Sequence, residues 1–307
     1  MLLSVVICTY NRSELLSRCL ESLTNQTLDN KCYEVIVADN NSTDNTVQVA
    51  QGYIGRLPNF EICREEKRGA NHTRNAGVGI AKGEYVAFID DDALADPDWL
   101  LNISEFIGRH PDIHVFGGPH DAFTLVPKPE WFPPEYGIFC LGNEERPVNL
   151  GSEWLVGTNL VVKKDAFVSV GGFNEKLGSI KTGSSFFQAG EETRLLIDLS
   201  ARGYTSYYVP SIKVTHLIRQ DKMSLRYLLF SGYRMGRNHN LTLNVKRSVL
   251  SHLVSLSATV VKAIYKLVNS GNIPVKRKLY YGFYPFYYES GAFIEYIAVH
   301  AGVCRKR

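Results

Sequence analysis

Three consecutive aspartates, Asp90, Asp91 and Asp92, follow an apolar run that is typical of a buried strand. Adjacent carboxylates repel one another, so their proximity costs free energy unless water or a cation surrounds them. Alternate side chains of a strand point the same way, and hard oxygen ligands favour Mg²⁺ or Mn²⁺ over zinc. Asp90 and Asp92 can therefore share a divalent cation that also bridges a diphosphate. The simpler alternative is an exposed turn whose aspartates cap the helix expected near Trp99.

Two arginines, Arg68 and Arg74, flank the segment 69–73, where a helix is expected to begin. Guanidinium groups near a helix N-terminus suit a phosphate-rich ligand. Isolated arginines also occur on solvated helix faces, so this pair indicates phosphate binding only together with other residues.

Polar residues also follow the first two expected strands. Asp39, at the end of the second strand, could accept hydrogen bonds from a base or a ribose, or could form an Asx turn with the residues after it. The candidate ligand-binding residues of these two turns are Thr9, Tyr10, Asn11, Arg12, Asp39 and Asn41.

The elements that must position these residues alternate between β-rich runs and helical patterns over the first 120 residues. This alternation predicts an α/β fold with a mostly parallel sheet flanked by helices, and such sheets bind ligands at the carboxyl ends of their strands. A helix is expected where Leu15 to Leu23 repeat at helical spacing. The expected strands are Leu3 to Thr9, Glu34 to Asp39, Phe60 to Arg64, Tyr85 to Asp90 and Ile113 to Gly117.

The second part of the chain begins with a proline-rich excursion over residues 120–151, which is typical of a flap or lid. A Ser- and Gly-rich loop is expected at 178–190, and the chain beyond His216 is expected to be helical. The remaining expected elements are strands at Trp154 to Val162, Tyr204 to Val209 and Lys213 to Thr215 and a helix at about Glu191 to Arg202.

The C-terminal part of this 307-residue chain differs from the rest in charge. From residue 245 onward there are ten Lys or Arg and two Glu, whereas the residues before it hold 24 basic and 29 acidic side chains. This basic, aromatic tail could contact an anionic membrane surface or form a solvated helix face. The apolar run Val249 to Val268 contains His252, Lys262 and Lys266, so it is not expected to cross a membrane.

The six cysteines lack CxxC or zinc spacing, as expected of reduced thiols in the cytoplasm. The N-terminal MLLSVVICTYN lacks the features of a signal peptide and predicts a first core strand. We therefore expect a cytoplasmic protein that could be peripheral on the inner face of the membrane.

The chain resembles a family 2 glycosyltransferase of the GT-A fold over about its first 220 residues. The motifs that carry the resemblance are VVICTYNR, VADNNSTDNT, RGANHTRNAGVGIAKGEYVAFIDDD, GTNLVVKKDAF, VGGFNEKLG and GEETRLLIDLSARGY. The resemblance implies a GT-A domain at 1–220, with a nucleotide-binding half at 1–120 and an acceptor and catalytic half at 121–220. Residues 221–307 form a helical extension that the resemblance does not explain.

The implied activity is an inverting transfer of a sugar from a nucleotide diphosphate sugar, usually UDP-linked, to an acceptor hydroxyl of a glycan or lipid-linked saccharide. The resemblance implies that Asp90 and Asp92 form the DxD metal motif for Mn²⁺ or Mg²⁺, with Asp91 beside the donor. It also implies nucleoside contacts from Thr9, Tyr10 and Asp39, and donor contacts from Arg68 and Arg74.

Inversion requires a base, which in similar enzymes is the Asp of a Glu-Asp pair at a helix start. The matching residues here are Glu191 and Glu192, so this chain carries Glu where the family has Asp. The resemblance implies that Glu192 is the base, with Glu191 as the second candidate; two acids that only stabilise a helix N-terminus are the alternative. His216 could complete the metal shell, or be structural.

Trp131 and Trp154 could stack on an acceptor sugar, although large aromatic residues more often belong to a core. A non-catalytic nucleotide-sugar-binding or regulatory protein would keep the aspartates without needing a base. A Rossmann dehydrogenase is disfavoured because no GxGxxG follows the first strand, and no nucleic-acid-binding motif is present. The sequence predicts neither the sugar, the acceptor nor the oligomeric state.

Overall fold

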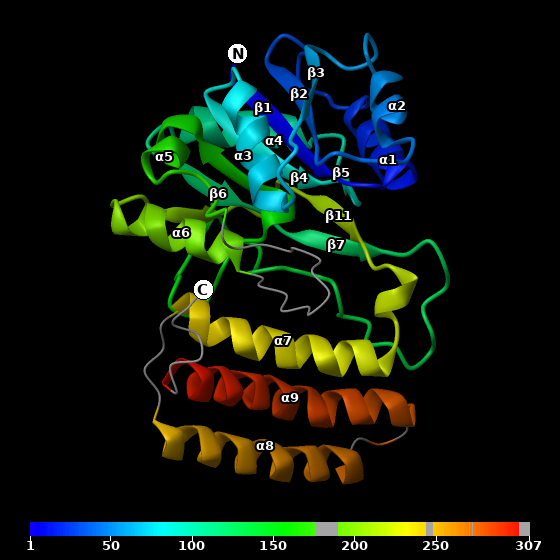
Figure 1. Cartoon of the computed structure of the whole chain (residues 1–307), viewed down its shortest axis with the longest axis vertical. Helices are drawn as coiled ribbons and strands as arrows, with labels where there is room; N and C mark the ends of the chain where they lie inside the picture. Colours follow the sequence, from blue (N-terminus) through cyan, green and yellow to red (C-terminus); the bar gives the residue numbers. More distant parts are fainter. Residues whose placement is uncertain (176–189, 244–247, 270, 272, 301–307) are drawn as a thin grey trace. The chain divides into compact units, whose positions relative to one another are not determined.

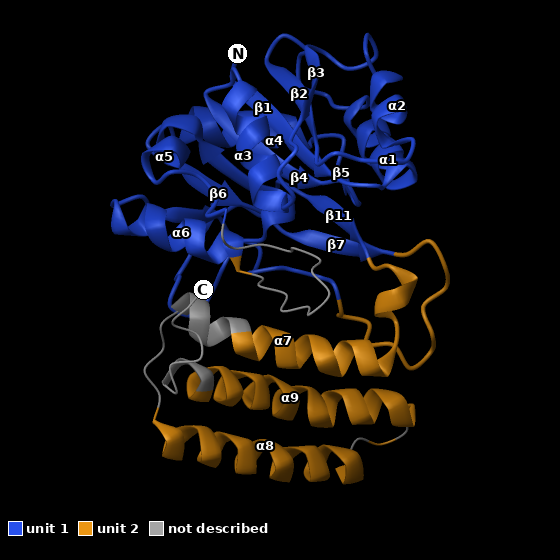
Figure 2. Ribbon diagram, in the orientation of Figure 1, with its two compact units in different colours: residues 1–123, 137–186, 191–217 blue, residues 124–136, 187–190, 218–307 orange. Residues whose placement is uncertain are grey.

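The computed structural model describes residues 1–175, 190–243, 248–269, 271 and 273–300. It divides into two compact units (Figures 1 and 2). Unit 1 comprises residues 1–123, 137–186 and 191–217, and unit 2 comprises 124–136, 187–190 and 218–307. The predicted boundary at residue 220 assigns 124–136 to the first domain, whereas these residues pack with the helices of unit 2.

The strands of unit 1 form one eight-stranded sheet, in the order β3-β2-β1-β4-β9-β6-β10-β8, and one three-stranded sheet, in the order β5-β11-β7. Strands β3, β2, β1 and β4 are parallel to one another, and β9 is antiparallel to both β4 and β6. The strands are β1 (Leu3–Thr9), β2 (Tyr33–Asp39), β3 (Phe60–Arg64), β4 (Tyr85–Asp90), β5 (Ala93–Ala95), β6 (Val115–Gly117), β7 (His120–Phe123), β8 (Arg146–Pro147), β9 (Leu160–Lys163), β10 (Ser206–Tyr208) and β11 (Val214–Leu217).

Helices cover both faces of the large sheet, as expected for a GT-A fold. The helices of unit 1 are α1 (Ser13–Leu23), α2 (Thr46–Gln51), α3 (Ala70–Ile80), α4 (Trp99–Arg109), α5 (Lys164–Ser169), α6 (Glu191–Ala201) and the 3₁₀ helix η1 (Gly157–Asn159). One core packs α1, α2 and α4 against the sheet, and a second core packs α3, α5 and α6 against the opposite face.

The alternation along β1 shows how the sequence builds these two cores. Val5 and Ile7 point into the core under α1 and α4, whereas Val6 between them points into the core under α3. Burial on both faces explains why β1 is apolar throughout, as parallel strands in the centre of α/β sheets usually are. The parallel register pairs Thr9 with Asp39 and Cys8 with Asp90. The polar residues that follow these strands therefore meet at one edge of the sheet.

Two sequence-based strand predictions need correction, and two elements were not predicted. The strand predicted at Trp154 to Val162 is a 3₁₀ turn followed by the shorter β9, because the Asn159 side chain bonds to Trp99 and to two backbone carbonyls. The strand predicted at Ile113 begins at Val115, and α2 and β5 were not predicted. The predicted loop 178–190 lies outside the described residues except for Gly190.

Unit 2 contains three long helices, α7 (Leu225–Leu243), α8 (Val249–Asn269) and α9 (Val275–His300), and the 3₁₀ helix η2 (Gln220–Lys222). Helix α9 packs against both α7 and α8 (Figure 1). Gly236 and Gly291 allow this close packing, since a Cβ on either would overlap backbone atoms of the facing helix. Among the described residues, we find no helix with the length and apolarity that a membrane crossing requires.

Candidate active site

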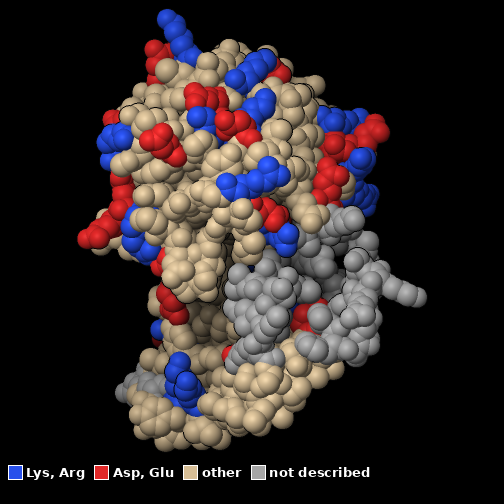
Figure 3. Space-filling view, turned by 90° about the vertical axis from the view of Figure 1, so that its left-hand side faces the viewer, with Lys and Arg blue, Asp and Glu red and all other residues tan. Residues whose placement is uncertain are grey.

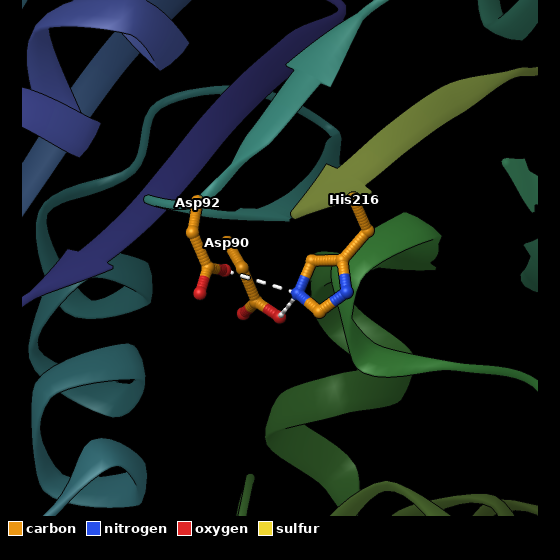
Figure 4. A group of neighbouring side chains, drawn as sticks. All are labelled: Asp90, Asp92 and His216. Carbon is orange, nitrogen blue, oxygen red and sulfur yellow. Dashed lines mark hydrogen bonds and ion pairs between the residues drawn. The ribbon is translucent and has the colours of Figure 1, made fainter. Parts of the chain in front are cut away.

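Asp90, Asp92 and His216 form a cluster at the carboxyl end of β4 (Figure 4). One ligand atom from each lies within 4.8 Å of the others. His216 Nε2 is 3.0 Å from Asp92 Oδ1 and 3.9 Å from Asp90 Oδ2. Two carboxylates and an imidazole are a suitable donor set for Mn²⁺ or Mg²⁺, so the predicted metal ligands fit such an ion.

The small sheet brings His216 to the aspartates, although they are more than 120 residues apart in sequence. His216 lies within β11 rather than after it, where it pairs with Ala93 of β5 and with Ala122 of β7. The backbone N–H of Leu217 donates to the carbonyl of Asp92 at 3.0 Å. Strand β5 follows the aspartates directly, so pairing between β5 and β11 fixes the distance between the histidine and the carboxylates.

Asp91 has a different environment from its two neighbours. The Thr9 hydroxyl donates to its Oδ2 at 2.8 Å, and Arg12 Nη1 donates to its Oδ1 at 2.6 Å and to Asp92 Oδ2 at 3.2 Å. Burial raises the pKa of Asp91 to about 6, while Arg12 favours its ionised form. Asp91 and Asp92 are only 3% and 7% exposed, so the alternative of an exposed capping turn is wrong. Thr9 and Arg12, which are predicted nucleotide contacts, both bind this aspartate.

Arg74 connects the aspartates to the two predicted bases. From α3, its Nη2 donates to Asp90 Oδ1 at 3.1 Å, while Nη1 lies 3.6 Å from Glu191 Oε1 and 3.8 Å from Glu192 Oε1. Although burial opposes its charge, the nearby carboxylates of Asp90 and Glu192 raise the pKa of Arg74 above its ordinary value. This arginine therefore stays cationic between the cluster of Asp90, Asp92 and His216 and the start of α6.

Glu192 lies in a confined, partly buried position at the start of α6. Burial, followed by the charge of Glu191, raises the pKa of Glu192 to about 7, while Arg74 opposes the shift. Gly157 lies directly against the Glu192 side chain: a Cβ at that position would be 2.7 Å from Cγ of Glu192 and still closer to its carboxylate. The resemblance leads us to expect an aspartate at this position. The longer side chain of Glu192 fits because Gly157 beside it has no side chain.

The predicted nucleoside-binding residues lie at the ends of β1 and β2. Asp39 Oδ2 accepts from the Ser42 N–H at 3.0 Å in the expected Asx turn, while its buried Oδ1 has no hydrogen-bond partner. Arg68 lies over the exposed Tyr10 ring, with 5.9 Å between its Cζ and the ring centroid. Asp39 therefore has a buried acceptor without a partner at the end of β2, and Tyr10, with Arg68 over its ring, directly follows the paired strand β1.

Asn11 and Asn41 shape these same turns, and both have left-handed backbones, with φ of 51° and 62°. The N–H of Asn11 donates to the Ser42 hydroxyl at 2.9 Å, and Asn11 Oδ1 accepts from the Thr43 N–H at 2.7 Å. Asn41 Oδ1 accepts a hydrogen bond from Arg64. Asparagine tolerates this conformation better than most residues, which explains its use at both positions.

The two tryptophans do not form a common site within either unit. Trp154 belongs to unit 1 and is 46% exposed, so it has an accessible ring. Trp131 belongs to unit 2, where its carbonyl accepts from Arg277 Nε at 3.1 Å and Lys276 lies over its ring.

Two residues of this region were missed by the sequence analysis. The His120 ring lies 5.5 Å from that of His216, and burial, together with His216, lowers the pKa of His120 to about 4. Asn40 donates to the carbonyls of residues 65 and 67 and accepts from the N–H of Gly69, so it fixes the loop that carries Arg68. The ADNN motif contains Asn40, whereas only the pairing of β7 with β11 reveals His120.

The arrangement combines a candidate cation site, an arginine and a carboxylate whose raised pKa suits a base working near neutral pH. A cation held by Asp90, Asp92 and His216 would neutralise negative charge, and Glu192 could accept a proton. These groups fit a displacement reaction in which an anionic group leaves.

Comparison with known proteins identifies the family of this chain. The family model described as "Glycosyl transferase family 2" matches residues 4–150. A glucosyl-dolichyl phosphate glucuronosyltransferase of Haloferax volcanii is 30% identical over 242 residues, which cover 77% of this chain and 75% of that protein.

Two solved structures share the fold at 16% sequence identity. Residues 1–349 of S. aureus TarS in complex with UDP-GlcNAc align with a TM-score of 0.60, over 98% of this chain and 92% of that one. The mannosyltransferase PcManGT from Pyrobaculum calidifontis, in complex with GDP-Man and Mn²⁺, aligns with a TM-score of 0.59, over 98% of this chain and 75% of that one. The chain has the GT-A fold and belongs to glycosyltransferase family 2, as its motifs predicted.

Proposed function

We propose that this enzyme transfers a sugar, with inversion, from a UDP-sugar to an acceptor hydroxyl. In the reaction, the acceptor oxygen forms a bond to the anomeric carbon while the bond from that carbon to the diphosphate oxygen breaks. The electron pair of the broken bond leaves with the diphosphate, and the hydroxyl proton passes to Glu192. The observation that carries the proposal is the arrangement of the charged groups in space. Arg74 lies between the cluster of Asp90, Asp92 and His216 and the carboxylate of Glu192.

The cation proposed for this cluster is Mn²⁺ or Mg²⁺, which would supply Lewis-acid stabilisation of the leaving diphosphate. Asp90, Asp92 and His216 would hold it. Arg12 and Thr9 keep Asp91 and Asp92 in place through hydrogen bonds. The buried Nη1 of Arg74 has no hydrogen-bond partner among the described residues and could donate to a phosphate oxygen.

The nucleoside is proposed to bind at the ends of β1 and β2. Asp39 Oδ1 is buried without a partner, and an unpaired buried carboxylate oxygen is costly, so a donor from a base or ribose would satisfy it. Tyr10, with Arg68 beside it, offers a surface on which a base could stack. Thr9 is proposed to act through Asp91, because its hydroxyl is already engaged there.

The acceptor is proposed to be a lipid-linked saccharide or another glycan. The name of the H. volcanii relative describes a glucosylated dolichyl phosphate as its substrate, which supports this class. Trp154 has an exposed ring that could stack on an acceptor sugar. A cytoplasmic location is proposed from the absence of paired cysteine motifs and from the free thiols of the five described cysteines.

The experiment is to incubate the purified full-length chain with UDP-, GDP- and dTDP-sugars and either Mn²⁺ or Mg²⁺. Release of the nucleoside diphosphate measures slow donor hydrolysis, and a productive donor should also raise the melting temperature by mass action. We expect a UDP-sugar to give both signals. Release from GDP-sugars alone would refute the UDP assignment, and no release from any donor, with or without candidate acceptors, would refute the proposed reaction.

A further inference from the structure

Helix α8 exposes a predominantly apolar face. Val254, Val261 and Ile264 are 60%, 66% and 57% exposed, although their side chains are large and apolar. Exposed apolar side chains are ordinary when scattered, but a contiguous row usually marks an interaction site. The residues of this row, which we term the outer face of α8, are Leu250, Leu253, Val254, Val260, Val261, Ile264, Tyr265 and Val268.

Helical spacing places all of these residues on one side of α8. At 100° per residue they all fall on one side of the helix, and the exposed Ser257 lies among them between Val254 and Val260. The opposite side of α8, with His252, Thr259 and Ala263 buried, packs on α9. Ala263 lies against Gly282 of α9 there. The outer face therefore has no partner among the described residues of unit 2 (Figure 1).

The charges around the outer face have a single sign. Between residues 245 and 288 the chain contains seven Lys or Arg and neither Asp nor Glu. Lys262 is exposed on α8 beside this face, and Lys276 is exposed at the start of α9, whereas Lys266 points to α9 and donates to the carbonyl of Tyr281. Where Figure 3 shows unit 2, its described surface is mostly uncharged. The outer face is thus apolar at its centre and cationic beside it.

We infer that the outer face of α8 binds the surface of an anionic lipid bilayer. An apolar stripe beside lysines is the pattern of a helix lying in the membrane interface, where the apolar side chains enter the acyl boundary and the lysines reach the anionic headgroups. Tyr265, which is 67% exposed, suits the same depth because its ring is apolar and its hydroxyl is polar.

Charge favours this occupant over a second copy of the chain. Two copies that met through the outer face would bring Lys262 of each close to the basic segment of the other, with no acidic side chain between residues 245 and 288 to compensate. Like charges at an interface disfavour association, whereas anionic headgroups complement them. The inference does not rest on the proposed function, because it concerns a surface of unit 2 and can be tested without turnover.

The test is flotation of the full chain with vesicles of phosphatidylcholine alone or mixed with phosphatidylglycerol. The variant Val254→Gln/Val261→Gln/Ile264→Gln removes the centre of the stripe and keeps helix propensity, since glutamine is a better helix former than valine or isoleucine. Its matched control is Ile54→Gln/Val168→Gln, which alters two residues of unit 1 that are 64% and 62% exposed. Donor hydrolysis and the melting temperature of each variant check that unit 1 is intact.

We expect the wild type and the control to float with the mixed vesicles and the triple variant to remain unbound. Lys262→Gln should weaken binding about five-fold, and added salt should weaken it further, whereas Lys31→Gln in unit 1 should have no effect. Equal flotation of the triple variant and the wild type would overturn the inference. Equal binding to neutral and mixed vesicles would also overturn it. So would a wild type that does not bind vesicles but forms a dimer in light scattering, if the triple variant is monomeric.

Discussion

Arg74 forms a 3.1 Å hydrogen bond to Asp90 through Nη2, and its other terminal nitrogen faces Glu191 and Glu192. One buried guanidinium therefore contacts a candidate metal ligand on one side and lies within ion-pair distance of the candidate base on the other. The guanidinium of Arg74 therefore connects the proposed site of diphosphate departure with the proposed site of proton transfer.

The candidate metal site predicts a specific dependence on divalent cations. Asp92→Asn should lower metal-supported release of the nucleoside diphosphate at least about 100-fold at limiting cation, because one of three ligands loses its charge. The measurement is activity against Mn²⁺ concentration after treatment with a chelator. Asp98→Asn, in the same segment but outside the cluster, serves as the control. Unchanged cation dependence in Asp92→Asn would remove Asp92 from the site.

Glu192 is predicted to be the base. Glu192→Gln should lower kcat for sugar transfer by roughly 10²- to 10⁴-fold with little change in KM for the donor, because glutamine cannot accept the acceptor's proton. Glu191→Gln is the matched variant and should lose less activity. If Glu191→Gln instead suffers the larger loss in kcat, the base is Glu191.

The pH dependence of kcat should reflect the environment of Glu192. Burial and Glu191 raise its pKa to about 7, so a base at this position is protonated and inactive as the pH falls below that value. The acid limb of the kcat profile, measured at saturating cation, should therefore lie near neutral pH. If the acid limb lay at the ordinary pKa of an exposed carboxylate, the result would contradict the assignment of Glu192 as the base.

Arg74 should influence that acid limb. Its positive charge lowers the pKa of Glu192, so Arg74→Met should move the limb to higher pH, whereas Arg74→Lys should move it less. Arg74→Met should also lower the free energy of unfolding by about 3 to 5 kcal/mol, since it leaves buried carboxylates without their cation. A profile that does not shift would show that Arg74 and Glu192 are not coupled in solution.

Gly157 is predicted to position Glu192. In Gly157→Ala the new methyl group would overlap the end of the Glu192 side chain, which can move, so the fold should survive while the base is displaced. We expect kcat to fall at least about 10-fold, since small misplacements of catalytic groups are costly. The shorter side chain in Gly157→Ala/Glu192→Asp should recover part of the loss. Additive losses in the double variant would argue against the steric contact.

Asn159 should contribute stability rather than chemistry. Its fully buried side chain accepts from Trp99 Nε1 at 2.9 Å and donates to the carbonyls of Pro119 and Ile212. Asn159→Ala leaves these buried groups unpaired and should lower the free energy of unfolding in urea by about 2 to 4 kcal/mol. Asn25→Ala, at an exposed position with one helix-end hydrogen bond, should change stability by less than about 1 kcal/mol.

Much of unit 1 could be predicted from local patterns. Strands β1 and β4 have the predicted bounds, because buried parallel strands need apolar side chains on both faces and end where polar residues begin. The edge strand β3 also has its predicted bounds. The short strand β5 escaped prediction because three residues carry too little periodicity. The turn at Gly157–Asn159 escaped because its backbone is fixed by the long-range bonds of Asn159.

The sequence alone determined the family, the sheet edge and the identities of the aspartates and glutamates, because ordered motifs and strand ends are local features. Only the tertiary structure decided which residues these side chains contact. Pairing between β5 and β11 brings His216 to Asp92, burial assigns Asp91 to Thr9 and Arg12, and helix packing places Arg74 beside Glu192. These contacts join residues that lie far apart along the chain, and no local pattern records such distances.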